Sequence, residues 1–218
     1  VNIAMVGKYV TLTDSYVSVN HALKHAGASI GKNVSIEWID SETLDGNVEK
    51  LGNFDGILVP GGFGTRGSEG IIKTANFARE KNIPYLGICF GFQLAAVAFG
   101  RNVCGLNGAN STEIDPTTTN PVIDLLPEQK AVANMGGSLR LGTNDINVKE
   151  NSLAYKIYNS KFISKRHRHR FEFNKEYIDM FIEKGMVFSG DSDNGKRMEI
   201  LQIPSHKFFF GVQFHPEF

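Results

Sequence analysis

The sequence has 218 residues, and its 23 Lys and Arg residues balance 23 Asp and Glu residues, so the formal net charge is zero. This balance argues against a uniformly basic protein that binds nucleic acid or a membrane surface. Hydrophobic residues make up 41% of the chain, which suits a single folded domain over residues 1–218. No apolar run has the length of a membrane span. Two cysteines exclude a disulfide-rich scaffold and indicate a reducing compartment such as the cytoplasm.

The first half of the chain alternates strand-like and helix-like segments. Short apolar runs predict strands at 2–6, 34–39, 57–59 and 83–88. The opening run lacks a basic leader, so we expect a strand there and not a signal peptide. Apolar residues at helical spacing predict helices at 15–30, 71–82 and 90–99, the last with Gly100 as its C-cap. This repetition predicts an α/β fold with a doubly wound, mostly parallel central sheet flanked by helices.

The second half of the chain has a different pattern. Residues 107–120 are rich in Asn, Thr and Gly and predict a loop, and one apolar face predicts a helix at 175–184. Strands are expected at 138–149, 162–173, 186–191, 197–203 and 207–214. We expect these strands to give the sheet a mixed or antiparallel edge.

The segment Gly87-Ile88-Cys89-Phe90-Gly91 joins a predicted buried strand to a predicted buried helix. Strand, sharp turn and helix are the context of a nucleophile elbow, here with cysteine as the nucleophile. The positive end of the helix favours the thiolate of Cys89, and the N–H of Phe90 would face an oxyanion. The alternative is a cysteine packed as a small apolar residue, which is the role expected for Cys104.

Among the six histidines, His215 has the sequence context of a catalytic partner. It follows the apolar run at 208–214, and Glu217 lies two residues further on. An extended backbone places these two side chains on the same side, where a carboxylate can fix the imidazole tautomer. His21 and His25 lie one helical turn apart beside Lys24, which predicts a solvated helix face instead.

A second glycine-rich turn, Pro60-Gly61-Gly62-Phe63-Gly64, follows the predicted strand at 57–59. Its backbone N–H groups could cradle a phosphate, but the Gly-Lys-Ser/Thr of a P-loop is absent. The same N–H groups could supply a second oxyanion donor, as in α/β-hydrolases, or the segment could be a plain tight turn.

These motifs together resemble the class I (triad) glutamine amidotransferase domain, through GICFGFQ at 87–93 and FHPEF at 214–218. Further segments narrow the resemblance to the glutaminase domain of the CTP synthase family. They are PGGFGTRGSEG at 60–70, NSTE at 110–113, GGSLRLG at 136–142 and KRHRHRFEFN at 165–174. The resemblance covers residues 1–218 and implies the flavodoxin-like fold of class I glutamine amidotransferases.

The resemblance implies hydrolysis of L-glutamine to glutamate and ammonia through a γ-glutamyl thioester on Cys89. His215 and Glu217 complete the implied catalytic triad, and the N–H groups of Gly62 and Phe90 form the implied oxyanion hole. The implied glutamine-binding residues are Gly62, Phe63, Phe90, Gly91, Phe92, Gln93, Glu113 and Arg170. Of these, Glu113 suits the α-ammonium of the substrate and Arg170 suits its α-carboxylate. Arg66 and Arg140 are the implied contributors to GTP binding or to a lid at 136–142.

The resemblance also implies partners beyond this chain. In the family, an N-terminal synthase domain of the same polypeptide uses ATP and Mg²⁺ to aminate UTP to CTP, and GTP is an allosteric activator. We expect no cofactor and no metal in the glutaminase domain itself, and no CTP synthesis by this chain alone. The full-length protein is expected to be a cytoplasmic homotetramer that binds neither nucleic acid nor membranes.

Two other functions remain possible from the sequence. A cysteine peptidase or a γ-glutamyl hydrolase could use the same elbow with a different substrate. A catalytically silent module could bind a partner or nucleic acid through the basic run at 166–170. If that run is an extended strand, its arginines share one face and its histidines the other, so a solvated edge strand is a further interpretation.

Overall fold

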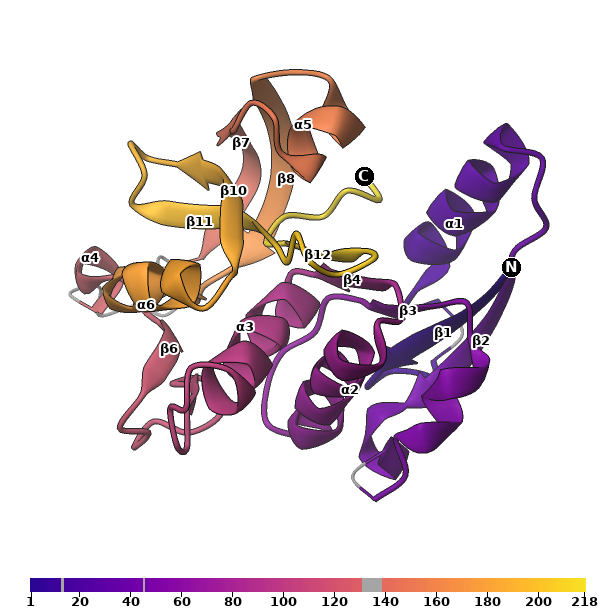
Figure 1. The fold of residues 1–218 in the computed structure, drawn as a ribbon, viewed down its shortest axis with the longest axis horizontal. Helices are drawn as coiled ribbons and strands as arrows, with labels where there is room; N and C mark the ends of the chain where they lie inside the picture. The colour runs from indigo at the N-terminus through magenta and orange to yellow at the C-terminus, as the bar shows by residue number, and fades with distance from the viewer. Residues whose placement is uncertain (13, 45, 131–138) are drawn as a thin grey trace.

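The computed structural model describes residues 1–12, 14–44, 46–130 and 139–218. Its core is a nine-stranded sheet with the strand order β2-β1-β3-β4-β12-β11-β10-β7-β8 (Figure 1). The first five strands of this order pair in parallel. They are β2 (Ser35–Asp40), β1 (Asn2–Gly7), β3 (Gly56–Val59), β4 (Tyr85–Ile88) and β12 (Phe209–Val212). The strands predicted in the first half therefore lie in the parallel part of the sheet, together with β12 from the second half, which we expected at the mixed or antiparallel edge.

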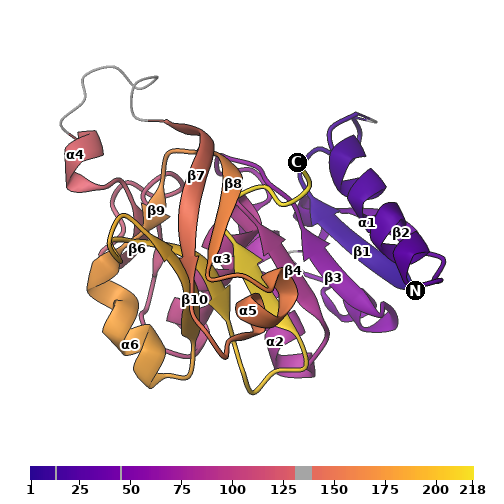
Figure 2. The same cartoon turned by 90° about the horizontal axis from the view of Figure 1, so that it is seen from above.

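The other four strands extend the sheet in antiparallel fashion beyond β12. They are β11 (Arg197–Gln202), β10 (Val187–Ser192), β7 (Arg140–Val148) and β8 (Phe162–His169). The antiparallel part is thus more than an edge, and its last two strands, β7 and β8, lie side by side in Figure 2. The start of the strand predicted at 138–149 lies partly outside the described residues.

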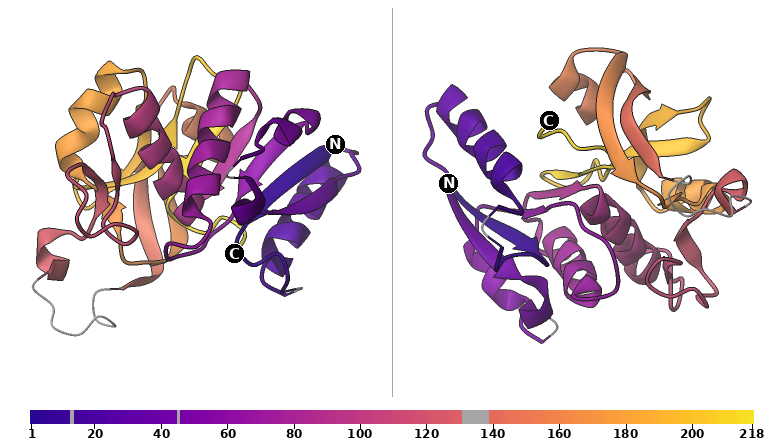
Figure 3. Two further views of the ribbon diagram at one scale, coloured as in Figure 1. Left: turned by 90° about the horizontal axis from the view of Figure 1, so that it is seen from below. Right: turned by 180° about the vertical axis from the view of Figure 1, so that it is seen from behind.

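Helices cover both faces of the sheet (Figure 3). On one face lie α2 (Ser68–Lys81), α3 (Phe90–Asn102) and α6 (Ile178–Glu183), and on the other lie α1 (Val17–Ser29) and α5 (Leu153–Tyr158). The short α4 (Pro127–Lys130) follows a small second sheet of β5 (Asn110–Ser111), β6 (Pro121–Asp124) and β9 (Glu172–Phe173). Short 3-10 helices span Ser41–Leu44, Glu49–Asn53 and Lys175–Tyr177.

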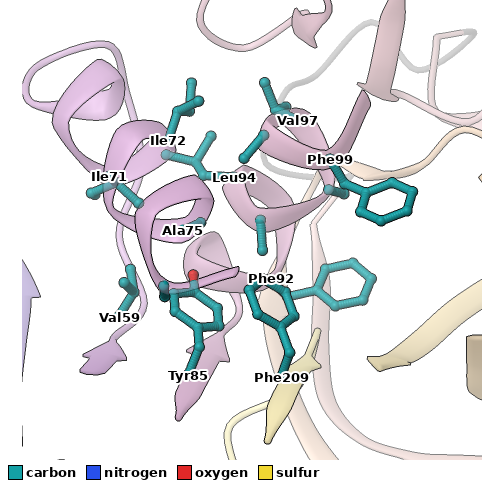
Figure 4. Packing of buried hydrophobic residues seen from close by; sticks show 14 of the residues in the cluster. Val59, Ile71, Ile72, Ala75, Tyr85, Phe92, Leu94, Val97, Phe99 and Phe209 are labelled. Atoms are coloured by element: carbon teal, nitrogen blue, oxygen red, sulfur yellow. The ribbon is translucent and has the colours of Figure 1, made fainter. Parts of the chain in front are cut away.

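Two hydrophobic cores follow from this layering, one on each face of the sheet. The larger core packs α2 and α3 on the parallel strands, and Figure 4 shows Phe92 of α3 near Phe209 of the sheet and Leu94 of α3 beside Ile72 of α2. The rings of Tyr85 and Phe209 stack with centroids 4.6 Å apart. Because α3 is buried almost all round, the residue that precedes it is held between the sheet and a rigid helix.

Several predicted boundaries are corrected by packing. The C-cap at Gly100 is wrong, since α3 continues to Asn102. Gly100 is needed for close packing instead, because a Cβ there would lie 3.3 Å from Val122 and 3.4 Å from Phe181. The helix predicted from residue 71 begins one turn earlier, at Ser68.

The strand predicted at 162–173 and the helix predicted at 175–184 are each divided in two. The first separates into β8 of the large sheet and β9 of the small sheet, and the second into a 3-10 turn and α6. The loop predicted at 107–120 contains the short strand β5, and α5 and β6 are not predicted at all. Within the described ranges, no helix combines the length and the apolar character needed to span a membrane.

Candidate active site

The predicted site residues meet at one edge of the parallel sheet. Lys8 follows β1, the turn at 60–64 follows β3, Cys89 follows β4 and His215 lies three residues after β12. All four of these strands run in the same direction, so their carboxyl ends lie together (Figure 1). In open α/β sheets this edge is where ligands bind.

Cys89 lies on the sharp turn that the sequence predicts between β4 and α3. Its backbone has φ 52° and ψ −97°, a strained conformation for a residue with a side chain. The turn is held by the Cys89 N–H, which donates to the carbonyl of Val212 at 2.7 Å. Gly87 allows α3 to approach, because a Cβ at this position would lie 2.6 Å from the backbone of Gly91. The side chain is 4% exposed, so the nucleophile is enclosed but reachable.

His215 is placed against Cys89 by contacts from both parts of the sheet. Its backbone N–H donates to the carbonyl of Arg166 on β8 at 2.8 Å, which forms an isolated bridge. Gly61 leaves room for the imidazole, since a Cβ there would lie 2.9 Å from His215 Cε1 and 3.7 Å from Cys89 Cβ. Glu217 completes the arrangement, with its Oε1 2.8 Å from His215 Nδ1.

The pKa of His215 is the net result of opposing effects. Burial, the largest single influence, lowers this pKa, but hydrogen bonds to Cys89 and Glu217 and the negative charges of both raise it to about 10. The imidazolium is therefore the stable form of His215 at neutral pH. A positively charged imidazolium beside a cysteine favours attack by its sulfur, as in other activated cysteine nucleophiles.

The two predicted oxyanion donors lie next to each other. As the first residue of α3, Phe90 has an N–H that its own helix cannot satisfy. A Cβ on Gly62 would lie 3.5 Å from the Phe90 ring, so the turn packs against the Phe90 side chain. Phe63, the next residue of the turn, is 69% exposed and marks the open side of the site.

Lys8 holds the turn at 60–64 through hydrogen bonds, and it was not predicted from the sequence as a site residue. Its Nζ donates to the carbonyls of Phe63, at 2.7 Å, and Gly64, and it lies 4.2 Å from the centre of the Phe90 ring. Burial lowers the pKa of Lys8 to about 8, against the opposing charge of Glu113. Lys8 thus holds the turn through two of its carbonyl groups.

The residues predicted to bind the α-groups of glutamine are also brought together. Glu113 follows β5, and its Oε1 accepts from the Gly64 N–H at 2.9 Å. Burial raises the pKa of Glu113, while that hydrogen bond and the charges of Lys8 and Arg170 oppose the rise. Arg170 lies just beyond the end of β8, close enough for its charge to act on Glu113. A carboxylate and a guanidinium thus border the same space.

The remaining predicted glutamine-binding residues lie on the first turn of α3. Gly91 and Phe92 are buried, and the Phe92 ring packs in the core, so only their backbones can line the site (Figure 4). Gln93 is 3% exposed, and its Nε2 donates to the Phe171 carbonyl at 2.9 Å and to Gln213 Oε1 at 3.2 Å. Its amide oxygen is the atom left to face a ligand.

The two arginines predicted for GTP binding or a lid have different environments. Arg66 is on the surface near the turn, paired with Glu42 at 2.8 Å and lying over the Tyr9 ring. Arg140 is buried, and its guanidinium pairs with Glu199 at 2.6 Å and lies 3.6 Å from Glu172. Its charge is already satisfied inside the protein. Of the segment predicted as a lid, residues 136–138 lie outside the described residues.

The basic run at 166–170 forms the end of β8 with the predicted alternation. Arg166 and Arg168 are exposed, while His167 and His169 are buried under the strand. His167 Nδ1 lies 3.0 Å from His169 Nε2, and burial lowers the pKa of both rings, so both are neutral. The run therefore has one exposed side with arginines and one buried side with neutral histidines. It is not a continuous positively charged surface of the kind that binds nucleic acid.

In the described parts of the chain, no three His, Cys, Asp or Glu side chains are grouped so that they could hold a metal ion. Cys104 lies outside the site, half-buried, and burial raises the pKa of its thiol to about 11. It is thus a poor nucleophile at neutral pH.

Lys8 and Gln213 are the two residues of the site that sequence reasoning missed. Each follows a parallel strand at its carboxyl end, which is a signal available from the sequence. Gln213 also lies two residues before His215, so an extended backbone places both on one side.

Comparison with known proteins agrees with this geometry. The family described as glutamine amidotransferase class-I matches residues 11–218. The chain therefore belongs to the class I glutamine amidotransferase family. Within that family its similarity is to the CTP synthases, and to their glutaminase domain in particular.

Three comparisons show the similarity to CTP synthases. The chain is 54% identical over 217 residues to the CTP synthase of Archaeoglobus fulgidus and 56% identical over 220 residues to that of Staphylococcus carnosus. Each match covers 100% of this chain but 41% of the relative's length. The glutaminase domain of the Trypanosoma brucei CTPS, solved with bound acivicin, is 37% identical, with a TM-score of 0.93 over 100% of this chain and 86% of that one.

Proposed function

We propose that this chain hydrolyses L-glutamine to glutamate and ammonia, with Cys89 as the nucleophile. The observation that carries the proposal is the strained elbow at Cys89 facing the His215–Glu217 pair, whose atoms lie 2.8 Å apart. A thiol, an imidazole and an orienting carboxylate are the parts of an acyl-transfer site. Family membership supports glutamine as the acyl donor.

The first half-reaction forms a thioester. The Cys89 sulfur attacks the side-chain amide carbon of glutamine, and the resulting oxyanion is bound by the N–H groups of Gly62 and Phe90. His215 donates its Nε2 proton to the amide nitrogen, the C–N bond breaks, and ammonia leaves. Removing one oxyanion donor of this kind typically raises the barrier by ~3 kcal/mol.

The second half-reaction regenerates the enzyme. His215, now neutral, takes a proton from a water molecule that attacks the γ-glutamyl thioester. The second tetrahedral oxyanion uses the same two N–H groups, the C–S bond breaks, and glutamate leaves the Cys89 thiolate beside a protonated His215. Glu217 keeps the imidazole proton on Nδ1 throughout, so that Nε2 is the atom that exchanges protons.

Substrate binding is assigned to the residues that border the nucleophile. Glu113 binds the α-ammonium and Arg170 binds the α-carboxylate of glutamine, which matches opposite charges at both ends. Gln93 and the backbones of Gly91 and Phe92 line one side of the bound side chain. Phe63 and the Gly62 turn line the other.

The larger protein is proposed from the relatives. Since the chain spans about two fifths of the curated CTP synthases that it matches, we infer that residues 1–218 form one glutaminase domain beside a synthase domain of the same polypeptide. That domain would use the ammonia, ATP and Mg²⁺ to convert UTP to CTP, with GTP as an activator to which Arg66 could contribute. A cytoplasmic homotetramer is the proposed assembly.

The test measures release of ammonia and glutamate from L-glutamine, together with covalent labelling by acivicin, a glutamine-analogue electrophile. We expect both turnover and labelling to be lost in Cys89→Ala, with peptide mapping placing the adduct on Cys89 in the unmodified sequence. Cys104→Ala is the matched control, because its thiol is half-buried and outside the site, and it should retain both.

Two outcomes would contradict the proposal. Turnover that survives in Cys89→Ala would exclude Cys89 as the nucleophile. An adduct on Cys89 without any turnover would show a formed pocket but no autonomous hydrolysis, and would place control of the reaction in the synthase domain.

A further inference from the structure

Gln213 is a buried polar residue in contact with the nucleophile that the proposed reaction does not use. It directly follows β12, and its side chain is fully buried. Its Nε2 lies 3.8 Å from Cys89 Sγ, within the range of an N–H···S hydrogen bond. A second contact of the thiol, with the Arg168 carbonyl, is longer at 4.0 Å, and a carbonyl cannot donate to sulfur. Gln213 is thus a neutral donor aimed at the sulfur.

The orientation of the Gln213 amide follows from its neighbours. The carbonyl oxygen of Phe171 can only accept, so the Gln93 atom 2.9 Å away from it is the amide nitrogen. The same Gln93 Nε2 lies 3.2 Å from Gln213, so the Gln213 atom there is the oxygen. The Gln213 nitrogen must then be the atom that faces Cys89. A backbone carbonyl therefore fixes both amides.

We propose that Gln213 is a positioning residue, held by Gln93, whose amide N–H stabilises the Cys89 thiolate. The proposal deepens the function proposed above and rests on the same nucleophile. A hydrogen bond to the charged form of a group favours that form. Unlike His215, an amide neither gains nor loses a net proton at ordinary pH, so it can donate to the sulfur throughout the reaction.

The chemistry gives Gln213 a defined effect in each half-reaction. Before attack, the N–H raises the fraction of Cys89 present as thiolate. In the thioester the sulfur is neutral and accepts weakly, and when the C–S bond breaks the electron pair returns to a sulfur that already faces a donor. Gln213 is fully buried and is not among the residues assigned to the substrate, so its main effect is on the rate.

The test measures the pH dependence of Cys89 alkylation by iodoacetamide, which requires no glutamine. Gln213→Met removes the donor at similar volume, and Gln213→Glu keeps the shape and the bond from Gln93 while replacing the N–H. We expect the pH at half-maximal alkylation to rise by about one unit in Gln213→Met, and further in Gln213→Glu because a carboxylate repels the thiolate. In glutamine hydrolysis, kcat should fall about tenfold with little change in KM.

Gln202→Met is the matched control, since Gln202 is a glutamine buried on β11 with no hydrogen bond to Cys89. It should leave the alkylation midpoint and kcat unchanged, and thermal unfolding of all three variants checks that they fold. An unchanged midpoint in both folded Gln213 variants would overturn the proposal, whatever happens to kcat. A shifted midpoint in a protein that fails to hydrolyse glutamine would support the role of Gln213 while rejecting the proposed function.

Discussion

Glu217 decides which nitrogen of His215 carries the fixed proton. Its Oε1 lies 2.8 Å from Nδ1, and a carboxylate can only accept there, so the proton is on Nδ1. In Glu217→Gln the new amide can donate to Nδ1 instead, which leaves the proton on Nε2 and prevents the imidazole from accepting one. We expect kcat for glutamine hydrolysis to fall by ~10³–10⁴, as for comparable substitutions in other triads, with glutamate release as the measurement.

The control for this variant is Glu150→Gln, which removes a carboxylate from an exposed pair with Lys161. It should leave kcat unchanged, because exposed ion pairs contribute little and Glu150 is outside the site. A Glu217→Gln enzyme within about threefold of the unmodified rate would show that tautomer control is not needed here.

The position of Cys89 depends on how closely α3 approaches β3. A Cβ on Gly91 would fall on the Val59 carbonyl and 2.9 Å from Val59 Cβ, so Gly91→Ala forces the helix away from the strand. We expect a loss of ~1–3 kcal/mol in the free energy of unfolding, measured by urea titration. Activity should fall by about 10² or more, because small displacements of a nucleophile are costly.

Gly52→Ala is the control for Gly91→Ala. Its added Cβ would only reach 3.9 Å from the Phe77 ring, an ordinary contact. We expect its unfolding free energy to change by less than ~0.5 kcal/mol. Equal losses in the two variants would mean that the approach of α3 to β3 does not set the position of Cys89.

The same elements show why part of the fold could be predicted and part could not. The parallel strands and the elbow are predictable because apolar runs and flanking glycines are local signals. The helix α5 has six residues and β5 has two, too few for any period to show. The division between β8 and β9 depends on Glu172 and Phe173 joining another sheet, which is a non-local choice.

The site follows the same distinction. Cys89, His215 and Glu217 are predicted from motifs of a few residues, and the structure places them together. Lys8 and Gln213 are missed because a lone lysine or glutamine after a strand is common. Their place in the site follows only from the sheet order, in which β1 lies beside β3 and β12 lies beside β4. The burial of Arg140 beside Glu199 is not visible in a one-dimensional pattern, and its suggested part in GTP binding or a lid stays a prediction.

At the scale of the whole molecule, stability should depend on pH through the acidic cluster under the β7–β8 hairpin. Burial, together with the charge of Glu199, raises the pKa of Glu172 to about 8, while Arg140 lowers it in part. Arg197 and His169 also face this carboxyl group, and His169 is neutral. Arg140 lies closer to Glu199, at 2.6 Å, than to Glu172, at 3.6 Å, so Glu172 is the group that keeps its proton.

The sign of the pH dependence follows from proton binding. Between pH 4.5 and 8 the folded state holds a proton on Glu172 that the unfolded state has lost, so the contribution of Glu172 to the free energy of unfolding falls as pH rises. Glu172→Gln removes this contribution, up to ~1.4 kcal/mol per pH unit, and should flatten the stability profile measured by urea titration. Glu37→Gln, on an exposed position of β2, should leave the slope unchanged. A steep slope retained in Glu172→Gln would assign the proton to another group.

The bridge between His215 and Arg166 has a consequence for the protein before it is fully folded. Cys89 belongs to the parallel part of the sheet, whereas the place of His215 is set by β8, the last strand of the antiparallel part. Until β8 has joined the sheet, the Arg166 carbonyl is not in place to hold His215 beside Cys89, and the thiol lacks its proton-transfer partner. Both parts of the sheet must therefore form before the site is complete.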